Sequence, residues 1–129
     1  MPPSRSKPKS KARIEAYLGG HRGEALAAWY LRFKLYRIIA RRYKTPLGEI
    51  DLIVQRFGTI AFVEVKTRSK AAAERETLEG INQGRISRAA QYWLAKHPAQ
   101  AGAILRFDVI FLARCHWPRH ISNAFDASP

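Results

Sequence analysis

The sequence predicts an α/β fold in which a mixed β-sheet is flanked by helices. Two segments have the apolar spacing of amphipathic helices, and three strand-like runs lie between them. A further apolar run follows the second helix, which gives the element order α-β-β-β-α-β. A chain of 129 residues has the length of one domain and is long enough to bury a core without disulfides.

The first predicted helix covers residues 21–34, because its apolar residues recur at i, i+3, i+4 and i+7. This spacing predicts an apolar stripe formed by Leu26, Trp29, Tyr30 and Phe33. A strand follows at residues 36–44, and the Pro and Gly of "TPLG" predict a turn after it. Residues 49–55 and 60–66 are apolar runs on either side of a short turn, so we expect a hairpin there.

The polar residues 68–79 predict a loop after the hairpin. A second helix over about residues 80–96 is indicated by an apolar stripe, and "HP" ends it. That stripe is formed by Ile86, Ala89, Ala90, Trp93 and Leu94. Residues 103–112 predict a buried strand, and "RHISNAF" is the candidate for a short last element.

The chain is strongly basic, with 23 Lys and Arg against 10 Asp and Glu and a net charge of +13. Residues 1–13 contain five of the basic residues, no acidic residue, three Pro and three Ser, and this composition predicts a disordered tail. Without the tail, 18 basic residues still face 10 acidic ones, a net charge of +8. Such a charge favours nucleic acid as a partner first and an anionic membrane surface second.

Residues 32–44 carry a second concentration of basic charge, with no acidic residue among them and two tyrosines between. One interpretation is a solvated strand edge that charge protects from aggregation. The other, which the charge of the whole chain favours, is a surface that contacts nucleic-acid phosphates. Its candidate binding residues are Arg32, Lys34, Arg37, Arg41, Arg42 and Lys44.

Several features of the sequence indicate a cytoplasmic protein. The single cysteine, Cys115, excludes an internal disulfide and fits a reducing compartment. No apolar run approaches the roughly 18 residues of a membrane span. The basic start has no apolar region behind it, so it is not a secretory signal. The four histidines and Cys115 lack the spacing of a zinc site.

The predicted hairpin carries four charges among apolar residues, at the strand ends away from the turn: Glu49, Asp51, Glu64 and Lys66. If the turn is symmetric about Phe57-Gly58, the numbers of paired residues sum to 115. Asp51 then lies opposite Glu64, and Glu49 opposite Lys66. An asymmetric loop would shift this register. As drawn, the Glu49–Lys66 pair is favourable, whereas the Asp51–Glu64 pair is repulsive and something must offset it.

Two converging carboxylates suit Mg²⁺ or Mn²⁺, which bind one or two carboxylates together with water and phosphate oxygens. A Lys on the same face of the strand can orient a water or stabilise charge on a phosphate. With a basic surface nearby, this set indicates metal-assisted phosphodiester hydrolysis. A polar sheet end whose charges pair among themselves explains the spacing equally well. Glu24 is either a helix-start acid favoured by the helix dipole or a third carboxylate aimed at the sheet.

The stretches "GEIDLI", "FVEVKTRS", "RFDVI" and "HISNAF" resemble the YraN family of small bacterial proteins, from about Gly20 to Phe125. That family is grouped with the PD-(D/E)xK nuclease superfamily and is similar in fold to archaeal Holliday-junction resolvases. The resemblance implies a restriction-endonuclease-like core in a single domain over residues 14–129. One departure is Ile50, which stands where the superfamily has Pro before its first acidic residue.

Carried over by position, the superfamily's metal-binding acid falls on Asp51 and its Glu-x-Lys on Glu64 and Lys66. Its first-helix carboxylate falls on Glu24. The resemblance therefore implies Asp51 and Glu64 as ligands of Mg²⁺ or Mn²⁺, Lys66 as a catalytic residue and Glu24 as an assisting one.

Two functions remain open at this point. One is a metal-dependent endonuclease that acts on DNA, with branched or damaged DNA as the substrate that the resolvase likeness suggests. The other is a nucleic-acid-binding protein that keeps the fold and the site without turnover. Whether the chain forms a homodimer, as resolvases do, is open too.

Overall fold

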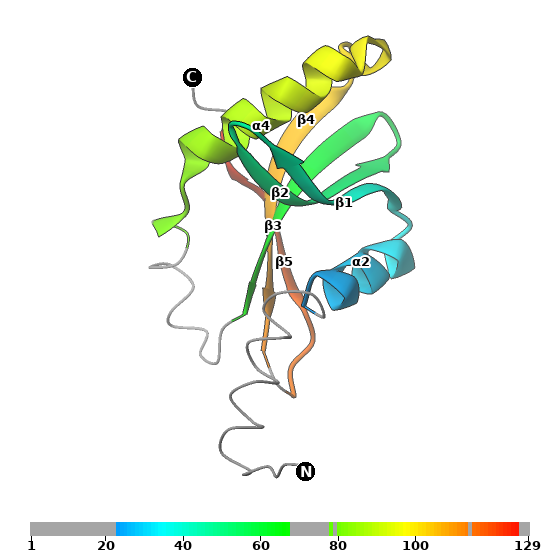
Figure 1. Ribbon diagram of the computed structural model, residues 1–129. Coiled ribbons are helices and arrows are strands. Elements are labelled where there is room, and N and C mark those ends of the chain that lie inside the picture. Colours follow the sequence, from blue (N-terminus) through cyan, green and yellow to red (C-terminus); the bar gives the residue numbers. More distant parts are fainter. Residues whose placement is uncertain (1–22, 68–77, 79, 114, 127–129) are drawn as a thin grey trace, which may run out of the picture.

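The structure is a computed structural model that describes residues 23–67, 78, 80–113 and 115–126 (Figure 1). The predicted tail at 1–13 and nearly all of the predicted loop at 68–79 lie outside these residues. The described elements follow the predicted order α-β-β-β-α-β, and "RHISNAF" forms a further strand. They are α2 (Gly23–Phe33), β1 (Arg37–Thr45), β2 (Gly48–Arg56), β3 (Thr59–Thr67), α4 (Gln83–Lys96), the 3-10 helix η3 (Pro98–Gln100), β4 (Ile104–Leu112) and β5 (Arg119–Phe125).

The strands form one mixed five-stranded sheet in the order β1-β2-β3-β4-β5. Neighbouring strands are antiparallel except β3 and β4, which are parallel. A parallel pair needs a crossover connection, and α4 lies within the one between β3 and β4. This arrangement confirms the predicted mixed sheet flanked by helices.

The two helices cover opposite faces of the sheet (Figure 1). On the α4 face, Trp93 packs edge-on against Phe62 with ring centroids 5.9 Å apart, and Phe62 in turn contacts Phe107. On the α2 face, Leu31 and two alanines of the helix pack on alternate residues of β2, β3 and β4. Each face is therefore closed by its own apolar cluster, and side chains of one strand alternate between the two clusters.

The apolar stripe predicted for α2 is not the side that packs on the sheet. Leu26, Trp29 and Phe33 are 50%, 61% and 74% exposed, whereas the buried residues of this helix are Gly23, Glu24, Ala27, Ala28 and Leu31. The helix has two apolar sides but meets only one sheet face, and its small alanines permit the closer approach. The large residues are left on the outer side.

The second helix begins at Gln83, three residues later than predicted, because Asn82 caps it. The Asn82 Oδ1 atom accepts a hydrogen bond from the Arg85 amide at 3.1 Å. The helix start lies against the start of β2, where a Cβ on Gly48 would come within 2.9 Å of the Arg85 carbonyl oxygen. Gly48 has a φ of +159°, so it also has a backbone conformation that favours glycine.

No helix within the described part of the chain is long and apolar enough to cross a membrane.

Candidate active site

The β2–β3 hairpin has the register that the sequence predicts near its turn. Phe57 and Gly58 both have positive φ, 54° and 92°, which is the backbone of a tight two-residue turn. From Arg56↔Thr59 to Leu52↔Val63, each pair of numbers sums to 115. The symmetric turn is thus confirmed, although Phe57 is not a residue that favours such a conformation.

The pairing of β2 with β3 stops at Leu52↔Val63, one step before Asp51. Instead, Asp51 accepts a hydrogen bond from the Val65 backbone amide, with Oδ2 and N 2.8 Å apart. The carboxylate therefore accepts the hydrogen bond that the Val65 amide would donate to the β2 backbone if the pairing continued. Asp51 is held rigidly at the point where the two strands separate.

The carboxylates of Asp51 and Glu64 lie close together at this point. Burial, followed by the charge of Glu64, raises the pKa of Asp51 to about 7, and the Val65 amide opposes part of that rise. A carboxyl group with such a pKa is destabilised in the folded protein when it is ionised. The repulsion predicted for this pair is therefore present, and a proton or a cation would relieve it.

Lys66 lies beside Glu64, with Nζ 3.1 Å from Oε2. The predicted Glu49–Lys66 pair is wrong, since the Glu49 carboxylate lies 4.0 Å from the Lys44 ammonium of β1. The reason is the register: β1 stays paired with β2 as far as Thr45↔Gly48, which puts Lys44 opposite Glu49, whereas the pairing with β3 has ended.

The side chains of Glu64 and Lys66 belong to the α4 face of the sheet. Ile60 and Phe62 precede them at even positions and pack in the cluster beneath α4, and side chains alternate along a strand. The Glu64 side chain is 19% exposed and that of Lys66 is 32% exposed. The three charged groups thus form a small acidic site with a lysine at its rim, open to solvent.

The donor set fits one hard divalent cation. Two carboxylates with one raised pKa offer charged oxygen ligands, and Mg²⁺ usually completes such a site with water and phosphate oxygens. Within the described residues, no three His, Cys, Asp or Glu side chains gather as a metal-binding group. Asp51 and Glu64 are therefore the two residues that could hold the ion here.

Glu24 is buried on α2 and forms an ion pair with Arg41 of β1. In the β1–β2 register Arg41 lies opposite Leu52, which packs in the cluster beneath α2. Glu24 thus faces the sheet, as one of the two predictions had it. Its carboxylate pairs with Arg41, and within the described residues it does not join two other acidic side chains in a metal-binding group.

The predicted nucleic-acid-binding residues lie along the edge of the sheet and the loop before it, because β1 is an edge strand. Arg32 and Arg37 are exposed near the end of α2, and Lys34 is partly buried between them. Arg41 and Lys44 are engaged by Glu24 and Glu49, and Arg42 is exposed with a φ of 50°. This placement suits both the charged-edge and the phosphate-contact interpretation.

A buried polar network on the α2 face is the feature that sequence reasoning described least well. Asp108 is fully buried and accepts two hydrogen bonds of 2.8 Å from Arg106, one of 2.8 Å from His120 Nε2, and one of 2.9 Å from the Asn123 amide. Burial would raise the pKa of Asp108, but these bonds outweigh it and hold the pKa below its usual range. The alternation of Arg106 and Asp108 along one strand suits this pair as well as a place at the acidic site, and no pattern in the sequence signalled His120.

The network continues to the end of α2, where Lys34 Nζ lies 2.7 Å from His120 Nδ1. Arg106 also donates to the Tyr36 hydroxyl at 2.6 Å. Asp108 is paired with Val63 in the β3–β4 register, so it lies on the α2 face, whereas the next residue of β3, Glu64, lies on the other. The network therefore joins β4, β5 and the α2–β1 connection, and is separate from the acidic site.

Comparison with known proteins identifies relatives along nearly the whole chain. The profile of the Uncharacterised protein family UPF0102 matches residues 23–112. The UPF0102 protein RPA0323 of Rhodopseudomonas palustris is 48% identical over 125 residues, which cover 97% of this chain and 96% of the relative. A UPF0102 protein of Methylorubrum extorquens is 50% identical over 107 residues, 83% and 84% of the two chains. One of Methylobacterium nodulans is 44% identical over 122 residues, 95% of each. The resemblance seen in the sequence motifs is thus confirmed, and the chain belongs to the Uncharacterised protein family UPF0102, the YraN family.

Proposed function

We propose that this protein is a divalent-metal-dependent endonuclease that hydrolyses phosphodiester bonds in DNA. The observation that carries the proposal is the pair of carboxylates where β2 and β3 separate, with Lys66 Nζ 3.1 Å from Glu64. The net charge of +13 supports a polyanionic substrate. The likeness of the YraN family to PD-(D/E)xK nucleases points to the same chemistry.

Asp51 and Glu64 would hold Mg²⁺ or Mn²⁺. When bound, such an ion polarises a phosphate and lowers the pKa of a water molecule. Asp51 contributes a carboxylate whose position the Val65 amide fixes, so little reorganisation is needed on binding. Lys66 directs its ammonium group to the same place, where it orients a water or stabilises negative charge that develops on the phosphate.

Glu24 has an indirect role in this proposal. Its carboxylate pairs with Arg41, whose side chain is 44% exposed. The buried carboxylate therefore holds the Arg41 side chain in place while that side chain remains accessible to a phosphate. Glu24 is thus a positioning residue for DNA. The exposed Arg32, Arg37, Arg42 and the partly buried Lys34 would add contacts along the same edge, together with Lys44.

The test is an Mn²⁺-dependent nicking assay on a panel of duplex, single-stranded, flapped and four-way DNA. We expect wild type to cut at least one member, and Glu64→Ala to lose both metal binding and cleavage while it keeps the fold. Glu49→Gln is a matched control, because it removes one carboxylate of the same hairpin that pairs with Lys44 instead. If wild type cuts no member in Mg²⁺ or Mn²⁺, the endonuclease proposal fails.

A second function has one observation in its favour. The Lys66 ammonium lies 3.1 Å from the Glu64 carboxylate and offsets its charge, and the described residues supply no third acidic ligand. Such an arrangement suits a nucleic-acid-binding protein that keeps the nuclease fold without turnover. In that case Glu64→Ala and wild type bind the DNA panel equally well, and neither cleaves it.

We also propose that the protein acts in the bacterial cytoplasm. Cys115 is exposed and unpaired with another cysteine, which fits a compartment that keeps thiols reduced. A homodimer, the state that the resolvase likeness suggests, would be measured by sedimentation velocity.

A further inference from the structure

The outer side of α2 and the loop after it form a surface that the acidic site does not use. Trp29 and Phe33 are exposed and stack on each other, with ring centroids 6.4 Å apart and planes inclined by 16°. Leu35 follows them and is 75% exposed with a φ of 72°. Large exposed apolar groups that gather in one place usually mark a binding surface.

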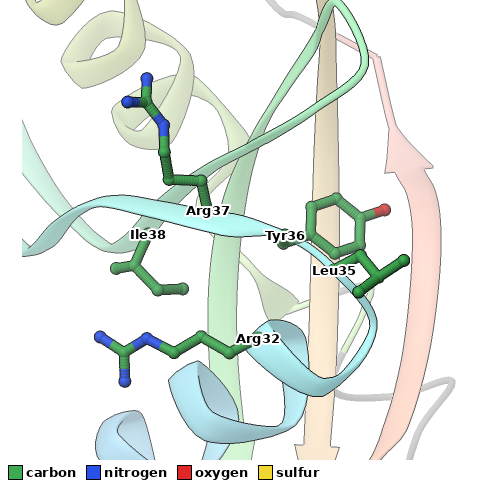
Figure 2. A pocket seen from close by; sticks show the side chains of 5 residues that line it. All are labelled: Arg32, Leu35, Tyr36, Arg37 and Ile38. Atoms are coloured by element: carbon green, nitrogen blue, oxygen red, sulfur yellow. The ribbon is translucent and has the colours of Figure 1, made fainter.

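An open pocket of about 460 Å³ lies at the end of this surface. It is lined by Arg32, Leu35, Tyr36, Arg37 and Ile38. In Figure 2 the Arg32 guanidinium lies on the side of β1 to which the Ile38 side chain points, whereas the Arg37 side chain extends to the other side of the strand. The pocket therefore combines two cations with an apolar wall, and its volume falls in the range of about 300–1,000 Å³ that small ligands occupy.

The two arginines are available for an anion. The Arg32 side chain is exposed and makes no hydrogen bond or ion pair with any other described residue. Arg37 makes one exposed hydrogen bond of 2.9 Å to the uncharged Gln55, which leaves its charge uncompensated. Two further cations are near: Lys34, and Arg56, which donates to the Lys34 carbonyl at 3.0 Å. Asp108, the acid whose charge acts on Lys34, is already bound by Arg106 and His120.

The pocket is separate from the acidic site. Arg37 pairs with Gln55, which is four residues along β2 from Asp51, or about 13 Å at 3.3 Å per residue. Ile38 packs with the cluster on the α2 face, whereas Glu64 belongs to the α4 face. A base that lies against Ile38 is therefore across the sheet from the carboxylates.

We propose that this pocket and the Trp29–Phe33 ridge bind unpaired nucleotides of single-stranded DNA. A phosphate lies against Arg32 and its base lies against Leu35 and Ile38. The next base stacks on the exposed face of Phe33, and Arg37 contacts a neighbouring phosphate from the other side of β1. Single-stranded DNA is bound in this way elsewhere, by a basic groove with aromatic side chains beside it. The inference rests on the proposed function, since it names the part of a DNA substrate that this surface takes.

Charge and shape favour this occupant over the alternatives. A second copy of the chain would bring the same cations together across a two-fold axis, and these would repel. An anionic membrane is bound by the apolar face of an amphipathic helix that carries Lys and Arg on its polar face, whereas here the cations line the same open pocket as the apolar side chains. Flat aromatic rings beside a pair of guanidinium groups match a base and its phosphate.

The experiment measures binding of fluorescein-labelled dT12 and of a 12-base-pair duplex by anisotropy, with the full chain in EDTA. Arg32→Gln combined with Arg37→Gln should weaken dT12 binding at least tenfold and duplex binding much less. Phe33→Ala should weaken dT12 binding by about fivefold or more, the scale expected when one base loses its stacking partner. The controls remove matched groups elsewhere: Arg88→Gln with Lys96→Gln on α4 for the charges, and the exposed Trp117→Ala for the ring.

Four results would overturn the proposal. The pocket variants lose dT12 and duplex binding equally, or lose neither. The α4 control weakens dT12 binding as much as the pocket variant does. Phe33→Ala changes the sedimentation coefficient of the free protein, which would make the ridge a contact between copies. Phe33→Ala loses binding to phosphatidylglycerol vesicles but not to dT12, which would make it a lipid surface. Because the assay contains no metal, Glu64→Ala should bind dT12 as wild type does, whether or not the protein cleaves DNA.

Discussion

The Asp51 carboxylate accepts a hydrogen bond from the Val65 amide at 2.8 Å, one residue beyond the last paired position of β2 and β3. This bond holds Asp51 beside Glu64 at the point where the strands separate. Apolar residues on both strands fix the hairpin up to that point, since Leu52, Ile53 and Val63 are buried. The charges lie in an apolar hairpin because the buried strands hold two repelling carboxylates together.

A divalent cation should therefore stabilise the protein. Mg²⁺ or Mn²⁺ at about 100 times its dissociation constant should raise the free energy of unfolding by about 2.7 kcal/mol, because it binds only the native state. Asp51→Asn should abolish this gain. The measurement is thermal unfolding with and without each metal, and Glu49→Gln, which should keep the gain, is the control. A wild-type melting temperature that neither metal changes would contradict the metal site.

The stability of the metal-free protein should depend on the charge of Asp51. Its pKa is about 7 in the fold, raised by burial and by Glu64, against the ordinary value of 3.8. The protonated carboxyl is thus the form that the fold favours, and its contribution is complete below about pH 4 and is lost as pH rises towards 7. Asp108, whose pKa is lowered, contributes stability that is lost only as pH falls towards and below 3.8, so its slope lies at the acid end of this window.

Urea unfolding at pH 5 and pH 8 would measure this effect as the difference between wild type and Asp51→Asn. Relative to the variant, wild type should be less stable at pH 8 than at pH 5. The affinity for Mn²⁺ should rise over the same interval, because the ion competes with the proton. An equal difference at both pH values would show that Asp51 titrates normally.

The sheet, its hairpin and the acidic pair could be predicted from sequence because they rest on local pattern. Alternation along β3 placed Glu64 and Lys66 on one face, and a two-residue turn at Phe57-Gly58 set the register up to Leu52. Counting beyond Leu52 failed for Glu49, because a register holds only while backbone pairing continues.

The inward side of α2 could not be predicted from periodicity, since both sides of this helix are apolar. Trp29 and Phe33 are large and regularly spaced, yet Ala27 and Ala28 allow the sheet to come closer, and packing decided between the two sides. The contact between His120 and Asp108 joins residues that are twelve apart on neighbouring strands. A bulge shifts the β4–β5 register between Phe107 and Val109, and sequence carries no sign of it.

Asp108→Asn should be strongly destabilising. The carboxylate is fully buried and accepts hydrogen bonds from Arg106, His120 and the Asn123 amide, so its replacement leaves a partly buried cation without its counter-ion. The loss should be about 3–5 kcal/mol in the free energy of unfolding, the range for breaking a buried pair from one side. Glu49→Gln breaks the exposed ion pair between Glu49 and Lys44, and it should change the free energy of unfolding by less than about 1 kcal/mol. The measurement is urea denaturation of both variants. Similar small losses of unfolding free energy in the two would show that the Asp108 network contributes little to stability.

Removal of residues 1–13 should weaken DNA binding without unfolding the protein. The segment carries five basic residues and no acidic one. For each phosphate that the shortened chain no longer neutralises, the log–log salt slope of duplex binding should become shallower by about 0.9. The measurement is duplex affinity between about 50 and 200 mM salt. An unchanged affinity and slope would show that these residues do not take part in binding.

Lys66→Ala should separate catalysis from binding. The Lys66 ammonium lies 3.1 Å from Glu64 and is 32% exposed, so its removal deletes a cation at the site but leaves both carboxylates in place. Cleavage should fall by roughly 10²–10³-fold, the scale for one electrostatic stabiliser of a transition state. Metal affinity should not fall, because a competing cation beside Glu64 is gone. The measurement pairs single-turnover nicking rates in Mn²⁺ with calorimetric titration of the metal, and Lys96→Ala, which removes an exposed lysine from α4, is the control. A variant that cleaves as fast as wild type would remove Lys66 from the mechanism and leave only the carboxylates in it.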